Sequence, residues 1–400
     1  MFKVWERYNL KKYRWSILLM IVLLCTSGIY VLDKVQGEDI NMVSRQIVGL
    51  VAGIFLAFVV SMFDYHFICK FAPLMYVINF GLLFVVKYVD SMNIARGGVN
   101  RWIGIPNEQH AVFEFQVSEL TKVVLVICLA VLFDRLMNKI KQGYVLLIAA
   151  VMIALPIGMI FIQPDLSTTI VVGVSLVVVI FVSGITYKIL LPIVAIALPV
   201  IAGLFWYVQQ DFQVLLSENQ QRRILSLLNP ESHSAELWQQ ENSITAIASG
   251  GLSGKIFSGS ESLGAKNIPV VESDFIFAGM AEAFGFLGAC IIVLIILMLS
   301  FQCFVIAKKA PDYLGRLIAI GIGTTFIFQA FVNIGVVTML LPNTGIPLPF
   351  VSYGLSSLMC NMIGIGIVLN IGIAKKKERN QIDLDFADIP RKAAFVYQFQ

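Results

Sequence analysis

The chain has 400 residues, of which 58% are hydrophobic and 14% charged, and its formal net charge is +4. Apolar runs of eighteen or more residues recur along it, each long enough to cross about 30 Å of hydrocarbon, which excludes a soluble globular protein. The small net charge gives no reason to expect nucleic-acid binding, and we expect none. We therefore predict an all-α polytopic membrane protein.

Hydropathy predicts about ten transmembrane helices, with both termini in the cytoplasm. The helices are expected near residues 15–33, 45–63, 69–88, 115–134, 144–162, 166–184, 188–208, 274–305, 314–340 and 351–374. They form one membrane-embedded domain over residues 1–374, followed by a charged cytoplasmic tail over residues 375–400. The first span follows a basic segment and lacks a small-residue cleavage site, so it is expected to be an anchor.

The distribution of basic residues predicts the orientation in the membrane. With both termini inside, nineteen of the 29 Lys and Arg residues lie on the cytoplasmic side and nine on the outer side, as the positive-inside rule requires. This orientation places residues 89–114, 209–273 and 341–350 outside. The large extracytoplasmic loop at 209–273, between helices 7 and 8, is expected to contain amphipathic helices at the headgroup region, with a solvated connector as the alternative.

The six cysteines lie in or at the edges of apolar spans, without the spacing of metal ligands. They predict neither a disulfide nor a structural zinc site.

Ionisable residues in or beside the spans are the first candidates for function, because each must be paired or face a wet cavity. Glu119 and Lys122 are three residues apart in the fourth span, so they share a helical face and are expected to pair near its outer mouth. The pair either neutralises itself for insertion or lines a cavity that receives a polar or anionic headgroup. Asp165, between the fifth and sixth spans, either caps the sixth helix or serves the site.

Asp274 opens the eighth span at the membrane surface, where it either belongs to the helix cap or performs chemistry. Glu282 follows two turns later and is expected within hydrocarbon, so Lys122 or a neighbouring polar group should approach it, or it should be protonated. The run from Gly250 to Lys255 lacks the spacing and the preceding strand of a phosphate loop, and its glycines are expected to form tight turns.

Arg222 and Arg223 are better candidates than this run for holding phosphate, because guanidinium groups bind phosphate in a bidentate manner at low desolvation cost.

Several motifs follow one another along the chain. They are Gly97-Gly98, Arg101-Trp102-Ile103, Phe115-Gln116, Ser118-Glu119 with Lys122, Gln163-Pro164-Asp165-Leu166, Gln221-Arg222-Arg223-Ile224, Leu228-Asn229-Pro230, Ala246 to Leu252, Ser273 to Ala278, Ala281-Glu282, and Leu341 to Gly354. In this order, from about residue 10 to residue 375, they resemble the shape, elongation, division and sporulation (SEDS) family of membrane glycosyltransferases, which includes FtsW, RodA and SpoVE.

Five positions depart from the usual pattern of that family. Its members usually have Pro where this chain has Val117, Gly where it has Ser167, and Glu where it has Val270. They usually have His in place of Glu272 and a second Gly in place of Leu355. The departures leave Asp274 in place but change its neighbours, so a divergent paralogue with altered regulation or substrate is compatible with them.

The resemblance implies a peptidoglycan glycosyltransferase that polymerises lipid II, with inversion, on the outer face of the bacterial cytoplasmic membrane. It implies that Asp274 is the catalytic general base or a ligand of Mg²⁺ or Mn²⁺, with no organic cofactor. The expected cavity residues are Arg101, Glu119, Lys122, Asp165, Arg222, Arg223, Glu282 and Ser352. The expected partners are a class B penicillin-binding protein acting as transpeptidase, and other divisome, elongasome or sporulation proteins.

Two further functions are compatible with a helical bundle that carries polar residues. A flippase or transporter of lipid-linked precursors would show broken helices in both halves of the bundle. A non-catalytic division or sporulation scaffold would tolerate the loss of Asp274. The single large outer segment with its clustered charges favours surface chemistry over both.

Overall fold

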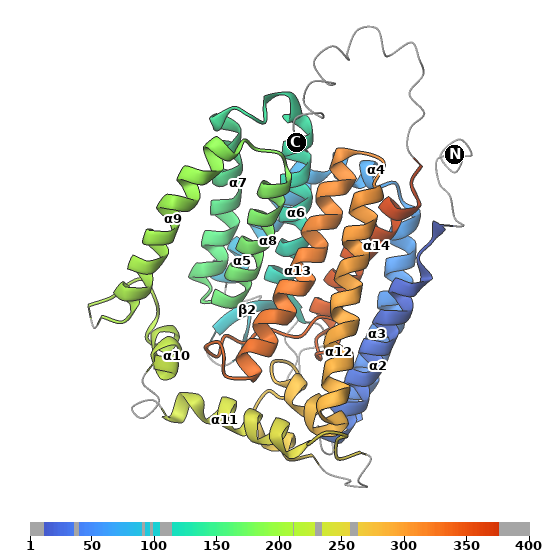
Figure 1. Cartoon of the computed structure of the whole chain (residues 1–400), viewed down its shortest axis with the longest axis vertical. Coiled ribbons are helices and arrows are strands. Elements are labelled where there is room, and N and C mark those ends of the chain that lie inside the picture. Colours follow the sequence, from blue (N-terminus) through green and yellow to red (C-terminus); the bar gives the residue numbers. More distant parts are fainter. Residues whose placement is uncertain are drawn as a thin grey trace.

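The computed structural model describes residues 12–35, 40–89, 93–96, 99–104, 114–210, 212–228, 234–256 and 263–375. The helices run roughly alongside one another in a bundle (Figure 1). The first described helix begins and the last one ends at the same end of this bundle, which we call the terminal end; the opposite end is the loop end. The predicted cytoplasmic tail beyond residue 375, the start of the basic N-terminal segment, Gly97-Gly98 and Asn229-Pro230 lie outside the described residues.

A helix lies at each of the ten predicted positions. These helices are α2 (Trp15–Val35), α3 (Ile40–Met62), α5 (Ala72–Tyr88), α6 (Val117–Arg135), α7 (Gly143–Ile162), α8 (Leu166–Val182), α9 (Tyr187–Val208), α12 (Ile276–Lys309), α13 (Tyr313–Val337) and α14 (Leu355–Ile373). A short helix, α4 (Tyr65–Lys70), precedes α5. Within the described residues, α2, α3, α7, α12, α13 and α14 are long and apolar enough to cross a membrane.

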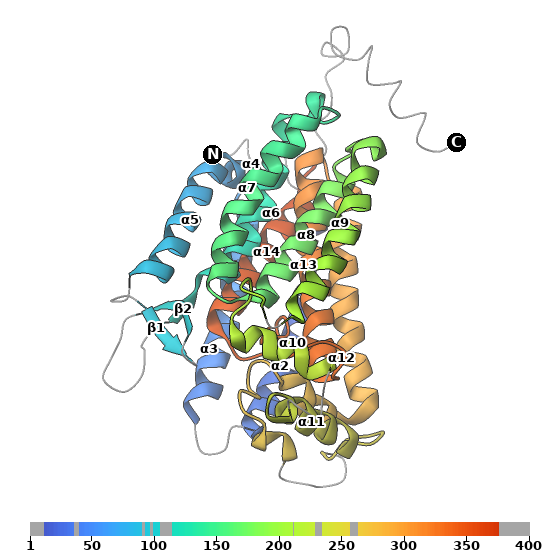
Figure 2. The ribbon, with the colours of Figure 1, turned by 90° about the vertical axis from the view of Figure 1, so that its left-hand side faces the viewer.

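The segment after α5 contains a small antiparallel sheet, so the expectation of an all-α protein was wrong here. Strands β1 (Asn93–Arg96), β2 (Val99–Gly104) and β3 (Glu114–Gln116) pair in the order β1-β2-β3. Figure 2 shows β1 and β2 beside the bundle, near the end of α5. Strands this short carry too few residues for a recognisable alternation of polar and apolar side chains, and their pairing fixes them instead.

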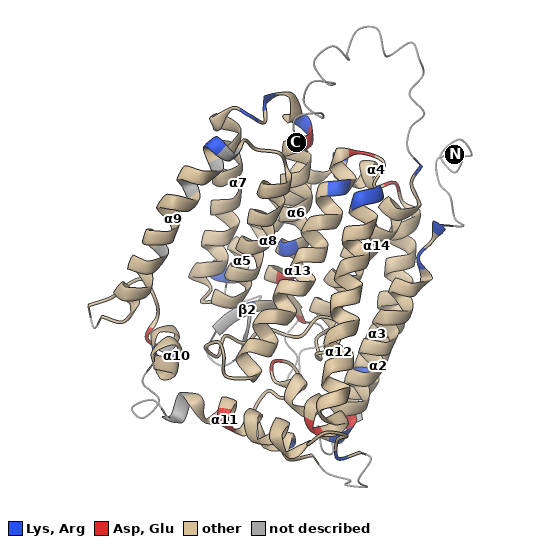
Figure 3. Ribbon diagram, in the orientation of Figure 1, with Lys and Arg blue, Asp and Glu red and all other residues tan. Residues whose placement is uncertain are grey.

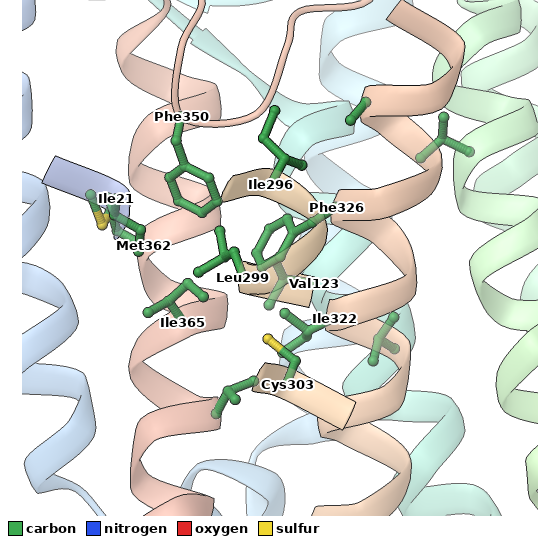
Figure 4. Packing of buried hydrophobic residues seen from close by; sticks show 14 of the residues in the cluster. Ile21, Val123, Ile296, Leu299, Cys303, Ile322, Phe326, Phe350, Met362 and Ile365 are labelled. Atoms are coloured by element: carbon green, nitrogen blue, oxygen red, sulfur yellow. The ribbon is translucent and has the colours of Figure 1, made fainter. Parts of the chain in front are cut away.

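Helix α13 lies at the centre of the bundle and packs against α6, α8, α12 and α14. Its Phe326 forms an edge-to-face contact with Phe350, with ring centroids 5.1 Å apart. Figure 4 shows both rings among apolar side chains from neighbouring helices, such as Ile296 and Val123. Helix α6 is buried along almost its whole length, as expected for a helix that is apolar on every side. The bundle therefore encloses polar residues on α6 and α13 away from lipid.

Helix α12 is two helices that meet at Gly285, whose φ of 69° and ψ of −172° are not helical. Two carbonyl oxygens just before Gly285 accept backbone hydrogen bonds of 3.0 and 3.2 Å from the glycine-rich segment, residues 250–256. Two N–H groups just after Gly285 donate bonds of 2.9 and 3.2 Å to the same segment. The segment thus satisfies the free backbone groups at both helix ends. The tight turns predicted for its glycines are confirmed by positive φ at Gly251 and Gly254.

Replacing Gly285 by alanine should destabilise the fold. The φ/ψ combination is accessible almost only to glycine, and a Cβ atom there would lie 2.3 Å from the backbone nitrogen of Gly254. We expect a loss of at least about 1–3 kcal/mol, seen as a lower thermal unfolding midpoint in detergent. Gly158→Ala is the matched control, because nothing lies within 4 Å of a Cβ at that position. Equal midpoints for the two variants would contradict the prediction.

The long loop contains α10 (Glu218–Leu228), α11 (Ser234–Ser249) and a short 3-10 helix, η5 (Gly264–Asn267). Helix α11 lies across the loop end of the bundle (Figures 1 and 2). Its Gln240 and Ser243 donate to the backbone carbonyl oxygens of Val336 and Val337, at 2.7 and 2.8 Å. Because these oxygens lie in the last turn of α13, α11 caps that helix. Helix α11 is therefore docked on the bundle, and the alternative of a solvated connector does not hold for this part of the loop.

Candidate active site

Asp274 lies at the loop end, just before α12, and is half-buried. Its Oδ1 accepts a hydrogen bond of 3.0 Å from the hydroxyl of Ser273. Its Oδ2 lies 3.0 Å from where a Cβ of Gly345 would stand, in the signature loop, residues 341–354. The residue at the N-cap position of α12 is Phe275, and the cap has no side-chain hydrogen bond. Asp274 therefore does not cap the helix, and Oδ2 faces the signature loop.

Two amide side chains on α13 hold Asp274 and the signature loop together. Asn333 Nδ2 donates to the backbone oxygen of Asp274 at 2.8 Å and to that of Ile346 at 2.7 Å. One turn away, Gln329 Nε2 donates to the backbone oxygen of Pro347 at 2.8 Å. Residues four apart on a helix share a face, so both amides reach the loop from the same side.

Ser352 is a structural link between the signature loop and the segment that carries Asp274. Its hydroxyl donates to the backbone oxygen of Ser273 and accepts from the backbone N–H of Leu348 at 2.7 Å. The N–H of Tyr353 donates to the backbone oxygen of Glu272 at 2.9 Å. The hydroxyl of Ser352 is thus occupied by backbone groups, rather than lining a substrate cavity as expected.

Lys122 forms a buried ion pair with Glu119, with Nζ 2.8 Å from Oε2. The same Nζ donates to Oε1 of Gln329 at 2.7 Å, and all three side chains are almost completely buried. The pairing predicted from their spacing is confirmed. Gln329 connects the ion pair to the backbone oxygen of Pro347. The ion pair therefore supports the signature loop, and Lys122 does not pair with Glu282.

Asp165 caps α8, since its Oδ1 accepts from the backbone N–H of Thr168 at 3.3 Å. Its Oδ2 accepts from the hydroxyl of Ser118 at 3.1 Å, and Arg101 Nη1 lies 4.0 Å from Oδ1. Arg101 also donates to two backbone carbonyl oxygens in the turn between α7 and α8. Asp165 therefore both caps the helix and joins β2, α6 and α8 at the loop end.

The two arginines of α10 lie in different surroundings. Arg222 pairs with Glu218 at 2.5 Å on the exposed face of the helix, so the structure does not bring it to Asp274. Arg223 points towards the signature loop, with Nη1 3.4 Å from the backbone oxygen of Asn343. Adjacent helical residues point about 100° apart, which is why only one of the two reaches the site.

Glu282 lies in the first part of α12, against residues of the long loop. It pairs with Lys255, accepts from the hydroxyl of Ser249 at 3.2 Å, and accepts from the N–H groups of Gly264 and Ala265 at 2.8 Å each. The break in α12 separates Glu282 from the long apolar part of that helix. The carboxylate of Glu282 holds the loop in place. Its partner is Lys255, a neighbouring polar group, and not Lys122.

The surroundings of Asp274 raise its pKa to about 6. Burial is the largest cause, and the negative charge of Glu272 adds to it. The hydrogen bond from Ser273 and the positive charges of Arg223 and Arg101 act in the opposite direction. A carboxylate with this pKa is mostly ionised at neutral pH and is still basic enough to accept a proton from a hydroxyl group.

The family model of FtsW, RodA and SpoVE, described as "Cell cycle protein", matches residues 9–377 of the chain. The chain belongs to this family. Peptidoglycan glycosyltransferase MrdB of Escherichia coli K12 is 30% identical over 375 residues, covering 93% of this chain and 96% of MrdB. Stage V sporulation protein E of Bacillus subtilis 168 is 32% identical over 381 residues, covering 90% of this chain and 98% of that protein.

A solved structure agrees with the fold. It is described as "Structural coordination of polymerization and crosslinking by a peptidoglycan synthase complex", and one of its chains superimposes with a TM-score of 0.73 at 25% identity. The alignment covers 90% of this chain and 97% of that one. This SEDS family member is therefore an integral membrane protein, in agreement with its six long apolar helices.

Three departures from the usual SEDS pattern have identifiable contacts. The hydroxyl of Ser167, where glycine is usual, donates to the backbone oxygen of Thr344 in the signature loop. Leu355 fills the space beside Gly49 of α3, where a Cβ on that glycine would lie 2.4 Å from the leucine. Val117 is fully buried in a small apolar cluster below the sheet. These side chains fit the fold without displacing Asp274.

Gln329 and Asn333 are site residues that were not predicted from the sequence. The predicted candidates were ionisable groups within spans, whereas these two residues are neutral amides in an otherwise apolar helix. Buried polar side chains in a membrane helix need partners for the same reason as charges, though at lower cost. Their spacing of four residues was the available signal.

Proposed function

We propose that this protein is a peptidoglycan glycosyltransferase that extends glycan chains with lipid II at the outer face of the cytoplasmic membrane. The observation that carries the proposal is Asp274, a half-buried carboxylate with a pKa of about 6, fixed at the loop end near two arginines. The names of its relatives support the same activity, since MrdB is a peptidoglycan glycosyltransferase. Purified protein given lipid II should form polymer, and no polymer under conditions that keep it folded would refute the proposal.

In the proposed reaction, Oδ2 of Asp274 accepts the proton of the acceptor sugar's 4-hydroxyl. The hydroxyl oxygen attacks the anomeric carbon of the donor, and the bond from that carbon to the lipid pyrophosphate breaks with its electron pair leaving on the pyrophosphate. Attack opposite the leaving group inverts the anomeric centre. Arg223 and Arg101 would stabilise the negative charge on the departing group. General base catalysis of this kind contributes roughly a hundred- to ten-thousand-fold.

We propose the orientation and the partner together. The loop end faces outward, because Lys and Arg residues gather at the terminal end (Figure 3), as expected for the cytoplasmic side. A class B penicillin-binding protein and lipid II are the proposed partners, with other division, elongation or sporulation proteins. Support for the first comes from the similar solved chain, which is part of a complex described as coordinating polymerisation and crosslinking.

As an alternative to its role as general base, we propose that Asp274 holds a divalent cation, Mg²⁺ or Mn²⁺. Within the described residues no group of three or more His, Cys, Asp or Glu side chains is placed to hold a metal ion. Magnesium nevertheless binds through one or two carboxylates together with substrate phosphates. Asp274 would supply the carboxylate and the lipid pyrophosphate the remaining oxygens, and the cation would add positive charge at the leaving group. Loss of polymerisation in EDTA, restored by added Mg²⁺, is the test.

The rate of polymerisation should fall as the pH is lowered through about 6. Asp274 must be ionised to accept a proton, and its raised pKa places the loss of activity near that value. Because the charge of Glu272 raises this pKa, Glu272→Gln should move the acid limb of the pH–rate profile to lower pH. Initial rates measured with labelled lipid II test both statements. If the acid limb of the pH–rate profile lies at the same pH in Glu272→Gln as in wild type, Asp274 is not the titrating group.

The structure offers less support for a flippase. Such a transporter would show discontinuous helices in both halves. Of the described helices, α12 alone contains a residue with non-helical φ/ψ. The glycine-rich segment fills this break with backbone hydrogen bonds, so the break is a closed structural joint and not a substrate site.

A further inference from the structure

A cavity of about 400 Å³ lies near the terminal end of the bundle, far from Asp274. Its lining comes from α8, α12 and α13: Val182, Phe304, Ala307, Lys308, Arg316 and Ile320. Four of these side chains are apolar, and the two others are cationic. The cationic residues belong to the last turn of α12 and the first turn of α13, so the charge lies at the membrane boundary and the apolar surface lies deeper.

Lys308 and Arg316 form no ion pair with any described residue. The natural partner of Arg316 is Asp312, one turn earlier on the same helix face. Both oxygens of Asp312 are occupied, however: Oδ1 accepts from the N–H of Gly315, and Oδ2 accepts from the hydroxyl of Tyr65 and lies 2.6 Å from a nitrogen of His66. A cation in the first turn of a helix is also disfavoured by the helix dipole. Arg316 therefore does not stabilise α13.

Apolar side chains of the neighbouring helices pack closely on α13 beside the cavity. Gly321 of α13 lies against Val179 of α8, and Gly323 lies against Cys303 and Phe304 of α12, so α8 and α12 flank α13 closely on two sides. Figure 1 shows α13 between these two helices. Farther from the terminal end, α8 and α12 carry large exposed apolar side chains: Val177 and Phe181 on α8, and Leu297 and Phe301 on α12.

We propose that this cavity binds an anionic phospholipid of the surrounding bilayer. Lys308 and Arg316 contact the phosphate of its headgroup, and an acyl chain lies along α13 between α8 and α12. The charge and the apolar lining of the cavity together select this ligand: a free anion would not use the apolar lining, and a zwitterionic lipid would not use both cations. Basic pockets between membrane helices on the cytoplasmic side bind anionic headgroups in this way, at about 1 kcal/mol for each basic residue.

The test is lipid binding to the purified full-length chain, measured by native mass spectrometry in detergent with phosphatidylglycerol or phosphatidylcholine. Wild type should bind phosphatidylglycerol in preference. Lys308→Gln/Arg316→Gln should bind it roughly thirtyfold more weakly, the equivalent of two lost basic contacts. The matched control is Lys139→Gln/Lys141→Gln, which removes two exposed charges from the loop between α6 and α7 and should bind as wild type does.

Val182→Trp tests the cavity without a change of charge, since the larger side chain should fill it and weaken binding while the cations remain. Equal affinity of wild type and Lys308→Gln/Arg316→Gln, equal binding of the two lipids, or full competition by inorganic phosphate would each overturn the proposal. Thermal unfolding of every variant shows whether it is folded, and a folded Val182→Trp variant with unchanged binding would also count against it.

Discussion

Replacing Asp274 by asparagine should abolish polymer formation from lipid II while the protein remains inserted and folded. Asparagine keeps the size and the hydrogen bond of the side chain but cannot accept a proton, so the rate should fall roughly a hundred- to ten-thousand-fold. Polymer length and amount on gels, with purified protein and labelled lipid II, measure the effect. Glu241→Gln on α11 is the matched control, because it removes a carboxylate from the same end of the molecule without touching the site.

The stability of the same variant separates catalysis from misfolding. The folded state raises the pKa of Asp274 above the ordinary value of 3.8, so the folded protein binds the proton more tightly than the unfolded chain does. The free energy of unfolding therefore falls as the pH rises from about 4 to about 6, because Asp274 ionises. At neutral pH this loss of stability is complete. Asp274→Asn should unfold at the same temperature as wild type or higher. If Asp274→Asn polymerises lipid II at the wild-type rate, Asp274 is not the general base.

Replacing Lys122 by methionine should have the second largest effect. It leaves Glu119 charged and unpaired in a buried position, which typically costs about 3–5 kcal/mol. Gln329 loses its partner at the same time, so its contact with the signature loop is no longer fixed. We expect a much lower unfolding temperature and little polymer. Lys266→Met, on the exposed 3-10 helix, is the control for the loss of one cation.

The double variant Glu119→Gln/Lys122→Met distinguishes the two roles proposed for this ion pair. Removing both charges together should restore most of the stability, because no buried charge is left unpaired. Activity should stay low, since no ammonium group remains to orient Gln329 towards Pro347. Full polymerisation by a stable double variant would mean that the pair serves membrane insertion alone.

The helices were predictable because each apolar run long enough to cross a bilayer forms a helix in which all backbone groups are satisfied. Predicted and observed ends differ by a few residues, as for the span expected at 166–184 and observed as Leu166–Val182. The sheet at 93–116 was not predictable, because its strands are short and are stabilised by pairing across a turn. The break in α12 was also hidden, since Gly285 in an apolar run looks like any other helical glycine.

Hydropathy and helical spacing along the chain were enough to predict a helical membrane protein and the pairing of Glu119 with Lys122. Those conclusions need only hydropathy, charge and helical geometry, which act over a few residues. Three contacts depend on how distant segments pack: Arg223 and not Arg222 approaches Asp274, Glu282 binds Lys255, and Gln329 and Asn333 hold the signature loop. Each of these contacts joins elements distant in sequence, where packing and not local pattern sets the partner.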